Sequence, residues 1–199
     1  MIANDCINRM YNNGVIAFKI KDVKKITGIS ETAIRNDIRA MIARGACGII
    51  QIKKGIYAFD KYNEFQIGCT VAKMHTNNYY IARYGAMSFN EMTEQIPTKI
   101  TIFTDNYRDD IMIKGVKFRF RIRRNKNSFF GIREKDGMRW SDRVKTAVDT
   151  IEDKNFSPSF TITTMANNKI GSADIKKYFK KTKYKKNIQK EKYIEKVAR

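Results

Sequence analysis

The residues with the clearest chemical potential lie in the stretch GISETAIRNDIRAMIARG, residues 28–45. If this stretch is helical after Ser30, one side of the helix is polar and carries Thr32, Arg35, Asn36 and Arg39. Arginine and asparagine can each form paired hydrogen bonds to the edges of guanine or adenine in the major groove of DNA. The chemistry that this face suggests is base recognition, although a polar face is also what keeps an ordinary surface helix soluble.

The flanking patterns predict the elements that would position this face. Apolar spacing predicts a helix over 1–12 and a short helix over 21–27, with a Gly-Ile-Ser turn before the third helix. Ser30 is suited to be the N-cap of that helix, which ends near Arg44. Its inward side is predicted to consist of Ile34, Ile38, Met41 and Ile42.

Two short β-rich runs follow, on either side of Lys53, Lys54 and Gly55. Glycine at the tip favours a tight hairpin. Three helices and a basic hairpin predict a winged helix-turn-helix domain over 1–60, in which the third helix reads bases and Lys53 and Lys54 contact phosphates. A winged helix that binds only protein is the alternative.

Composition supports a polyanionic partner. The chain has 199 residues, with 40 Lys and Arg against 20 Asp and Glu, so the net charge is +20. A hydrophobic content of 42% excludes simple disorder. Nucleic acid is the first candidate partner and an anionic membrane the second. No run approaches the roughly 20 apolar residues of a membrane-spanning helix. The N-terminal residues contain no apolar core segment of the kind found in a signal peptide. We therefore expect a cytoplasmic protein that is not in a membrane.

Other kinds of site receive little support from the sequence. The three cysteines, Cys6, Cys47 and Cys69, are scattered and are expected to be reduced, and His75 has no second ligand near it. We expect no metal and no cofactor, since no phosphate-binding glycine loop is present either. Glu152 and Lys154, with Asp142 or Asp136 before them, form a faint pattern like that of a metal-dependent nuclease. Their spacing is loose and is better explained by charges on a helix surface, so we expect no enzyme.

Residues 61–199 predict a second, α+β domain with a small antiparallel sheet. Its most distinctive segment, VKFRFRIR, alternates with period two. One face is apolar (Val116, Phe118, Phe120 and Ile122) and the other is a second basic surface (Lys117, Arg119, Arg121 and Arg123). That row of cations is either a solvated or protected strand edge, a nucleic-acid contact, or a site for an acidic protein.

The remaining segments complete this domain. Residues 127–133 could pair back on the basic strand, and residues 139–154 predict a helix with Val144, Ala147, Val148 and Ile151 inward. A Lys-rich tail, about 176–199, carries 11 basic and 2 acidic residues and partly helical spacing. The overall fold class is therefore α+β, with a winged helix-turn-helix at the N-terminus and a basic helical C-terminus.

The order of these segments resembles the AbiEi family, antitoxins and transcriptional regulators of type IV toxin-antitoxin systems. The resemblance runs from about Val15 to Lys181 and rests on the winged helix ending in KKGIYAF, on YYIARYGAMSFNEMTEQIPTKITIFT and on WSDRVKTAVDTIED. The block Tyr80 to Met87, the Gln95-x-Pro97 step and a Lys-Thr-x-x-Asp element (Lys145, Thr146 and Asp149) occupy the family's positions. Where the family has a Ser before its small-residue helix, this chain has Ala82 or Arg83.

The resemblance implies a repressor that binds inverted repeats in front of its own operon and opposes a nucleotidyltransferase-like toxin. We therefore expect a sequence-specific regulator that binds double-stranded operator DNA, with two copies on an inverted repeat. The predicted DNA-contacting residues are Ser30, Thr32, Arg35, Asn36, Arg39, Lys53 and Lys54. Two alternatives stay open: a module that binds an acidic protein, and a stand-alone regulator with no toxin.

Overall fold

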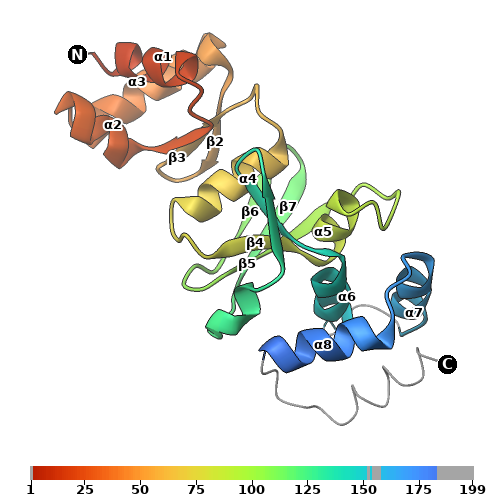
Figure 1. The fold of residues 1–199 in the computed structure, drawn as a ribbon. Helices are drawn as coiled ribbons and strands as arrows, with labels where there is room; N and C mark the ends of the chain where they lie inside the picture. The colour runs from red at the N-terminus through yellow and green to blue at the C-terminus, as the bar shows by residue number, and fades with distance from the viewer. Residues whose placement is uncertain (1, 152, 154–157, 183–199) are drawn as a thin grey trace. The chain divides into compact units, whose positions relative to one another are not determined.

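The computed structural model describes residues 2–151, 153 and 158–182 (Figure 1). These residues form a mixed α+β chain that divides into two compact units: the first holds the described residues up to 71 with 111–114, and the second holds 72–110 and the described residues from 115 onward. The division falls within α4 (Glu64–Lys73). Each unit has a sheet and a cluster of buried apolar side chains of its own.

The first unit combines three helices with a three-stranded sheet. Its elements are α1 (Ala3–Asn12), β1 (Ala17–Lys19), α2 (Ile20–Thr27), α3 (Glu31–Ala43), η1 (Ala46–Gly48), β2 (Ile49–Lys53) and β3 (Ile56–Phe59). The strand order is β1-β3-β2, and both pairings are antiparallel. The three helices and the hairpin are confirmed, because the apolar spacing and the glycines that predicted them are local signals.

The turn between α2 and α3 follows from three consecutive residue choices. Gly28 ends α2 with φ +75°, a left-handed conformation that glycine adopts at little cost. The Thr27 hydroxyl accepts from the Ile29 amide at 3.3 Å. Ser30 then caps α3 by accepting from the Ala33 amide at 3.3 Å, which confirms the predicted N-cap. The turn therefore sets the start of the polar helix.

A six-stranded sheet with helices beside it follows in the chain, and all of its strands belong to the second unit except β6, which the division splits after Asp110 (Figure 1). The strands are β4 (Tyr79–Ala82), β5 (Lys99–Thr104), β6 (Asp109–Ile113), β7 (Val116–Ile122), β8 (Ile132–Lys135) and β9 (Met138–Ser141), in the order β6-β7-β5-β4-β9-β8. The helical elements are α5 (Arg83–Phe89), η2 (Lys126–Phe129), α6 (Arg143–Ile151), α7 (Pro158–Asn167) and α8 (Ser172–Thr182).

The prediction of a small antiparallel sheet in this part was wrong. The sheet has six strands and is mixed, since β5 pairs with β7 and β4 pairs with β9 in parallel. Parallel pairing arises because β6 intervenes in the chain between β5 and β7, so that β7 returns beside β5 in the same direction. The alternation of apolar and polar residues along a strand indicates which face is buried, but it does not indicate which strand pairs with it.

Two further predictions for this unit need correction. Residues 127–133 do not pair with the basic strand, because they form η2 and then β8, which pairs with β9. The helix predicted from residue 139 starts at Arg143, since Arg139 to Ser141 belong to β9 and Trp140 there pairs with Ile81 of β4. A strand that is determined by pairing with strands far away in the sequence shows little of its own pattern in the local sequence.

Helix α6 lies at the centre of the helical side of the unit, packed against α5, α7 and α8. Its Ala147 and Val148 are buried, and Val144 and Ile151 pack on the same cluster, as predicted. Methionines supply much of the remaining core around it: Met87, Met92 and Met165. Among the described helices, none has the length and apolar character needed to cross a membrane.

Candidate nucleic-acid interface

The polar face of α3 lies where its sequence placed it. Ile34 and Ile38 are fully buried on one side, whereas Thr32, Asn36 and Arg39 are exposed. Ile42, expected on the inward side, is 39% exposed and lies at the border of that face. A helix with one buried side and one exposed polar side can present side chains to a groove of DNA.

One member of the predicted reading set is already engaged within the helix. The Arg35 guanidinium forms an ion pair with Glu31 at 3.2 Å, and the two side chains are 35% and 32% exposed. Ser30, another predicted contact, uses its hydroxyl as the N-cap of α3. Asn36 and Arg39 are therefore the best placed of the set to meet a base edge.

The hairpin β2–β3 presents the predicted phosphate ligands at its turn. Lys53 is half-buried at the end of β2, and Lys54 is exposed in the turn beside Gly55. Gly55 has φ +81°, so the tight turn depends on a residue without a side chain. The structure thus brings a lysine to the tip of a hairpin within the same unit as α3.

Sequence reasoning missed a second group of cations in this unit. Lys21, Lys24 and Lys25 are exposed on α2, the helix that precedes the turn into α3. In a helix-turn-helix protein the first helix crosses the DNA backbone, so lysines on it would meet phosphates. The signal was present in the run KIKDVKK, in which the lysines lie on the polar side of a short amphipathic helix.

The second basic surface does not form an open row of cations. Lys117, Arg119 and Arg121 of β7 all approach the carboxylate of Asp110 on β6, at 3.3, 3.8 and 2.6 Å. The hydrogen bond from Arg121 is the main cause that holds the pKa of Asp110 below its ordinary value, against the opposing effect of burial. One acid thus offsets part of the charge that the strand presents.

The fourth cation of that row points into the second unit. Arg123 pairs with Asp149 of α6 at 3.1 Å, and its guanidinium lies 4.0 Å from the centroid of the Phe103 ring. Its side chain is 12% exposed and Asp149 is fully buried. Arg123 therefore pairs with a buried acid inside the second unit, whereas the alternating pattern had placed it on the second basic surface.

The same carboxylate meets a second buried cation. Lys145 lies one helical turn before Asp149, with 3.6 Å between the ammonium nitrogen and the carboxylate, and both side chains are 0% exposed. The ammonium lies over the rings of Tyr80 and Tyr178, at 4.6 and 5.5 Å from their centroids. Aromatic faces attract a cation that has lost water, so these two rings offset part of the cost of burying the ammonium group.

A further ion pair extends this charge network toward the end of α6. Arg83 pairs with Asp153 at 2.9 Å and lies 5.1 Å from the centroid of the Phe103 ring, which also faces Arg123. Arg83 has φ +59°, which is unusual for a residue with a side chain. We refer to Arg83, Arg123, Lys145, Asp149 and Asp153 as the α6 charge network. Sequence reasoning did not predict it.

A polar network lies beside these charges. Thr146 is fully buried, and its hydroxyl is 2.7 Å from that of Ser141. The Asn90 side-chain amide donates to Thr146 at 3.1 Å and to the Ser141 carbonyl at 2.8 Å. Lys145, Thr146 and Asp149, the residues of the Lys-Thr-x-x-Asp element, are thus structural neighbours in the interior of the second unit.

The residues considered for catalysis do not assemble into a site among those described. Asp142 caps α6, because its carboxylate accepts from the Lys145 amide at 2.8 Å. Asp136 is exposed in the β8–β9 turn, and Glu152 and Lys154 lie outside the described residues. In the described part of the chain no group of three His, Cys, Asp or Glu side chains could hold a metal ion. His75 stacks on Tyr107 with 3.9 Å between ring centroids.

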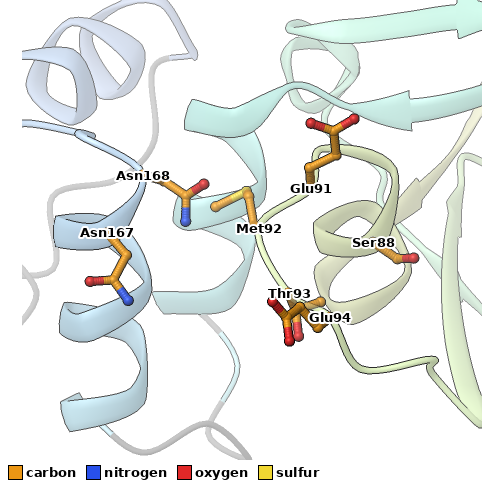
Figure 2. Close-up of a pocket in the computed structure, with 7 residues that line it drawn as sticks. All are labelled: Ser88, Glu91, Met92, Thr93, Glu94, Asn167 and Asn168. Atoms are coloured by element: carbon orange, nitrogen blue, oxygen red, sulfur yellow. The ribbon is translucent and has the colours of Figure 1, made fainter.

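One shallow pocket of about 520 Å³ lies between the segment after α5 and the end of α7 (Figure 2). Its lining is mostly polar: Ser88, Glu91, Met92, Thr93, Glu94, Asn167 and Asn168. Figure 2 shows Glu91 and Glu94 directed to different sides, so their carboxylates do not converge on one point. The Asn168 amide donates to the Thr164 carbonyl at 2.8 Å, within α7 and its end. The pocket offers hydrogen-bonding groups without a catalytic constellation.

No protein-family model matches the chain, and no curated protein matches it in sequence.

Proposed function

We propose that this chain is a sequence-specific, DNA-binding transcriptional regulator whose first unit is a winged helix-turn-helix. The observation that carries the proposal is the exposed polar face of α3, which follows a short capped turn from α2 and precedes a lysine-tipped hairpin. Helix, turn, helix and hairpin in this order are the parts of that motif.

Each part has a separate task under this proposal. Asn36 and Arg39 contact base edges in the major groove, and Arg35 joins them when it leaves Glu31. Lys54 at the hairpin and the lysines of α2 contact phosphates, which give affinity without sequence preference. The net charge of +20 favours association with DNA through release of counterions.

We further propose that the regulator is an autorepressing antitoxin of the AbiEi type, acting in the cytoplasm without catalytic activity of its own. What supports this role is the resemblance in sequence order. Two copies would occupy an inverted repeat, because helix-turn-helix proteins match their own symmetry to that of the operator. A nucleotidyltransferase-like toxin is the protein partner that the resemblance implies, and a stand-alone regulator is the alternative.

The second alternative, a module that binds an acidic protein through the β7 cations, receives less support. Lys117, Arg119 and Arg121 share the carboxylate of Asp110, and Arg123 pairs with a buried acid. A partner would have to compete with these ion pairs. The α3 face requires no such exchange at Asn36 or Arg39, so DNA binding through the first unit is the better-supported function.

The proposal is tested by titrating the full chain with its own upstream DNA and with a scrambled duplex over a series of salt concentrations. Arg39→Ala and Asn36→Ala should each weaken the binding free energy for the upstream DNA by about 1 to 3 kcal/mol and change that for the scrambled duplex little. Lys54→Ala should weaken binding to both duplexes alike and lower the salt slope by about 1.

Arg108→Ala is the matched control, since Arg108 is an exposed cation of the second unit. If Arg39→Ala and Asn36→Ala behave like Arg108→Ala, with the same small loss on both duplexes, α3 does not read bases. Equal affinity of the native chain for the two duplexes would remove the sequence-specific function altogether.

A further inference from the structure

An exposed aromatic side chain lies in a basic segment of the second unit. Phe130, directly after η2, is 46% exposed, although phenylalanine usually favours the interior. Residues 116–133 around it contain seven Lys and Arg and no Asp or Glu. The Phe130 ring packs against the Tyr178 ring with 5.8 Å between centroids, and nearly half of the residue remains exposed to solvent.

The backbone of Phe130 is fixed by contacts on both sides. The Tyr178 hydroxyl of α8 donates to the Phe130 carbonyl at 2.8 Å, and the Asp142 amide donates to the Gly131 carbonyl at 2.8 Å. Gly131 has φ +70°, and a Cβ there would lie 2.9 Å from an Asp142 carboxylate oxygen. The structure therefore holds this turn in one conformation, with η2 against α8 (Figure 1).

Two exposed arginines flank the ring. Arg124 lies six residues before Phe130, on the other side of the single turn of η2. Arg133 follows Phe130 by three residues in β8, a sheet-edge strand, so the two Cα atoms lie within about 10 Å of each other. Four of the seven cations of the segment are engaged with Asp110 or Asp149, and Arg124 and Arg133 are two of the other three.

We propose that Phe130, Arg124 and Arg133 form a binding surface for single-stranded nucleic acid. The ring would stack on an unpaired base, while the guanidinium groups contact the phosphates on either side. A duplex covers the faces of its bases, so it would use the arginines and not the ring. This surface lies in the second unit, and the inference does not rest on the function proposed for α3.

A fluorescently labelled oligothymidylate of about 15 nucleotides tests the proposal, since this length spans such a site. Its anisotropy is followed with the full chain over a salt series, with the equivalent duplex in parallel. Phe130→Ala should weaken single-strand binding about 5- to 100-fold at unchanged salt slope, because a stack and not a phosphate contact is lost. Arg124→Ala and Arg133→Ala should each reduce the slope by about 0.7.

Matched variants separate this surface from general effects. Ile96→Ala removes an 84% exposed apolar side chain, and Arg108→Ala removes an exposed cation just before β6, at the other edge of the sheet from β8. Both should leave single-strand binding within about twofold of the native chain. Phe130→Tyr keeps the ring and should restore most of the affinity that Phe130→Ala loses, with thermal melting showing that all variants fold.

Three results would overturn the inference. They are a Phe130→Ala affinity within twofold of Ile96→Ala, an equal loss for Phe130→Tyr and Phe130→Ala, and a loss on the duplex as large as on the single strand. Arg39→Ala serves as an internal reference, since Arg39 lies on α3 and its loss should weaken binding to the upstream duplex but leave binding to the oligothymidylate and its equivalent duplex nearly unchanged. Failure of one proposal therefore leaves the other testable.

Discussion

Arg35–Glu31 in α3 and Lys145–Asp149 in α6 are ion pairs with the same spacing of one helical turn, at 3.2 and 3.6 Å. The first pair is about one-third exposed, and the second is completely buried. In α3 the charged residues border a face that is open to solvent, whereas in α6 the pair is joined in the interior by Arg123, which also binds Asp149. The comparison separates two uses of charge within one basic chain.

The two environments differ in what the charges can do. An exposed pair is screened by water and stabilises a protein by about 0 to 1 kcal/mol, so Arg35 can exchange Glu31 for another anion. A buried pair has already lost its hydration, and removing one partner leaves the other charge without compensation. The α3 face is thus suited to binding, and the α6 charge network is suited to holding β7, α5 and α6 in register.

The largest effect that tests this comparison is expected for Asp149→Asn. It removes the carboxylate between Arg123 and Lys145, and we expect the free energy of unfolding to fall by about 3 to 5 kcal/mol. Glu31→Gln, the matched change in α3, should cost no more than about 1 kcal/mol. Chemical denaturation of both variants measures the difference, and similar small losses would show that burial does not distinguish the two pairs.

Two glycines with left-handed backbone extend the comparison from charge to packing. Gly28 has φ +75°, and a Cβ there would meet nothing within 4 Å, whereas at Gly131, with φ +70°, a Cβ would meet Asp142 and Tyr178. Gly28→Ala should cost about 1 kcal/mol of strain. Gly131→Ala should cost about 2 to 3 kcal/mol, because overpacking adds to the strain. Thermal unfolding of the two variants tests this order, and an equal loss would contradict it.

The first unit was largely predictable because its signals are local. Ser30 as a cap, Gly28 in the turn and the spacing of Ile34 and Ile38 all act within one or two helical turns. The same locality applies to the hairpin at Lys54. The candidate DNA face could therefore be assigned, whereas the engagement of Arg35 by Glu31 and the exposed lysines of α2 were not predicted.

The second unit depends on partners that lie far apart in the chain. Pairing of Ile81 with Trp140, or of Arg123 with Asp149, joins residues that no periodicity relates. Fully buried lysine and aspartate are rare, so the pattern around α6 predicted charges on the surface. The exposed Phe130 was missed for the converse reason, since an apolar residue is assigned to a core by default.

A smaller effect is expected at Asp110, whose pKa is lowered chiefly by the hydrogen bond from Arg121. A carboxyl group with a lowered folded-state pKa stabilises the fold above its unfolded pKa of about 3.9. That contribution is lost as the pH falls through the folded-state pKa. We expect Asp110→Asn to lower the free energy of unfolding by at most about 1 kcal/mol at pH 7, because the group is partly exposed.

The pH dependence provides the test for Asp110. The stability difference between the native chain and Asp110→Asn should be constant from about pH 5 to 7 and should shrink below about pH 4. Asp136→Asn, at an exposed turn position of the same unit, is the control, since it makes the same change of side chain where the described residues show no ion pair. A difference that grows on acidification would have the wrong sign for a carboxylate stabilised by Arg121.

The smallest expected effect concerns the binding side of the comparison. Glu31→Gln removes an anion from the α3 face and releases Arg35 from its ion pair. If that pair competes with DNA, affinity for the upstream duplex should rise about 2- to 5-fold, in keeping with the strength of an exposed pair. The salt slope should also steepen by up to about 0.9 if Arg35 then contacts a phosphate.

Glu94→Gln is the matched control, because Glu94 is an exposed acid of the second unit and the substitution changes net charge equally. Fluorescence anisotropy with the two variants separates a local effect from a general one. A rise with Glu31→Gln alone would place Arg35 at the DNA contact. An equal rise with both variants would mean that net charge is responsible, and the polar face of α3 would then be no better a DNA contact than any other exposed surface of the chain.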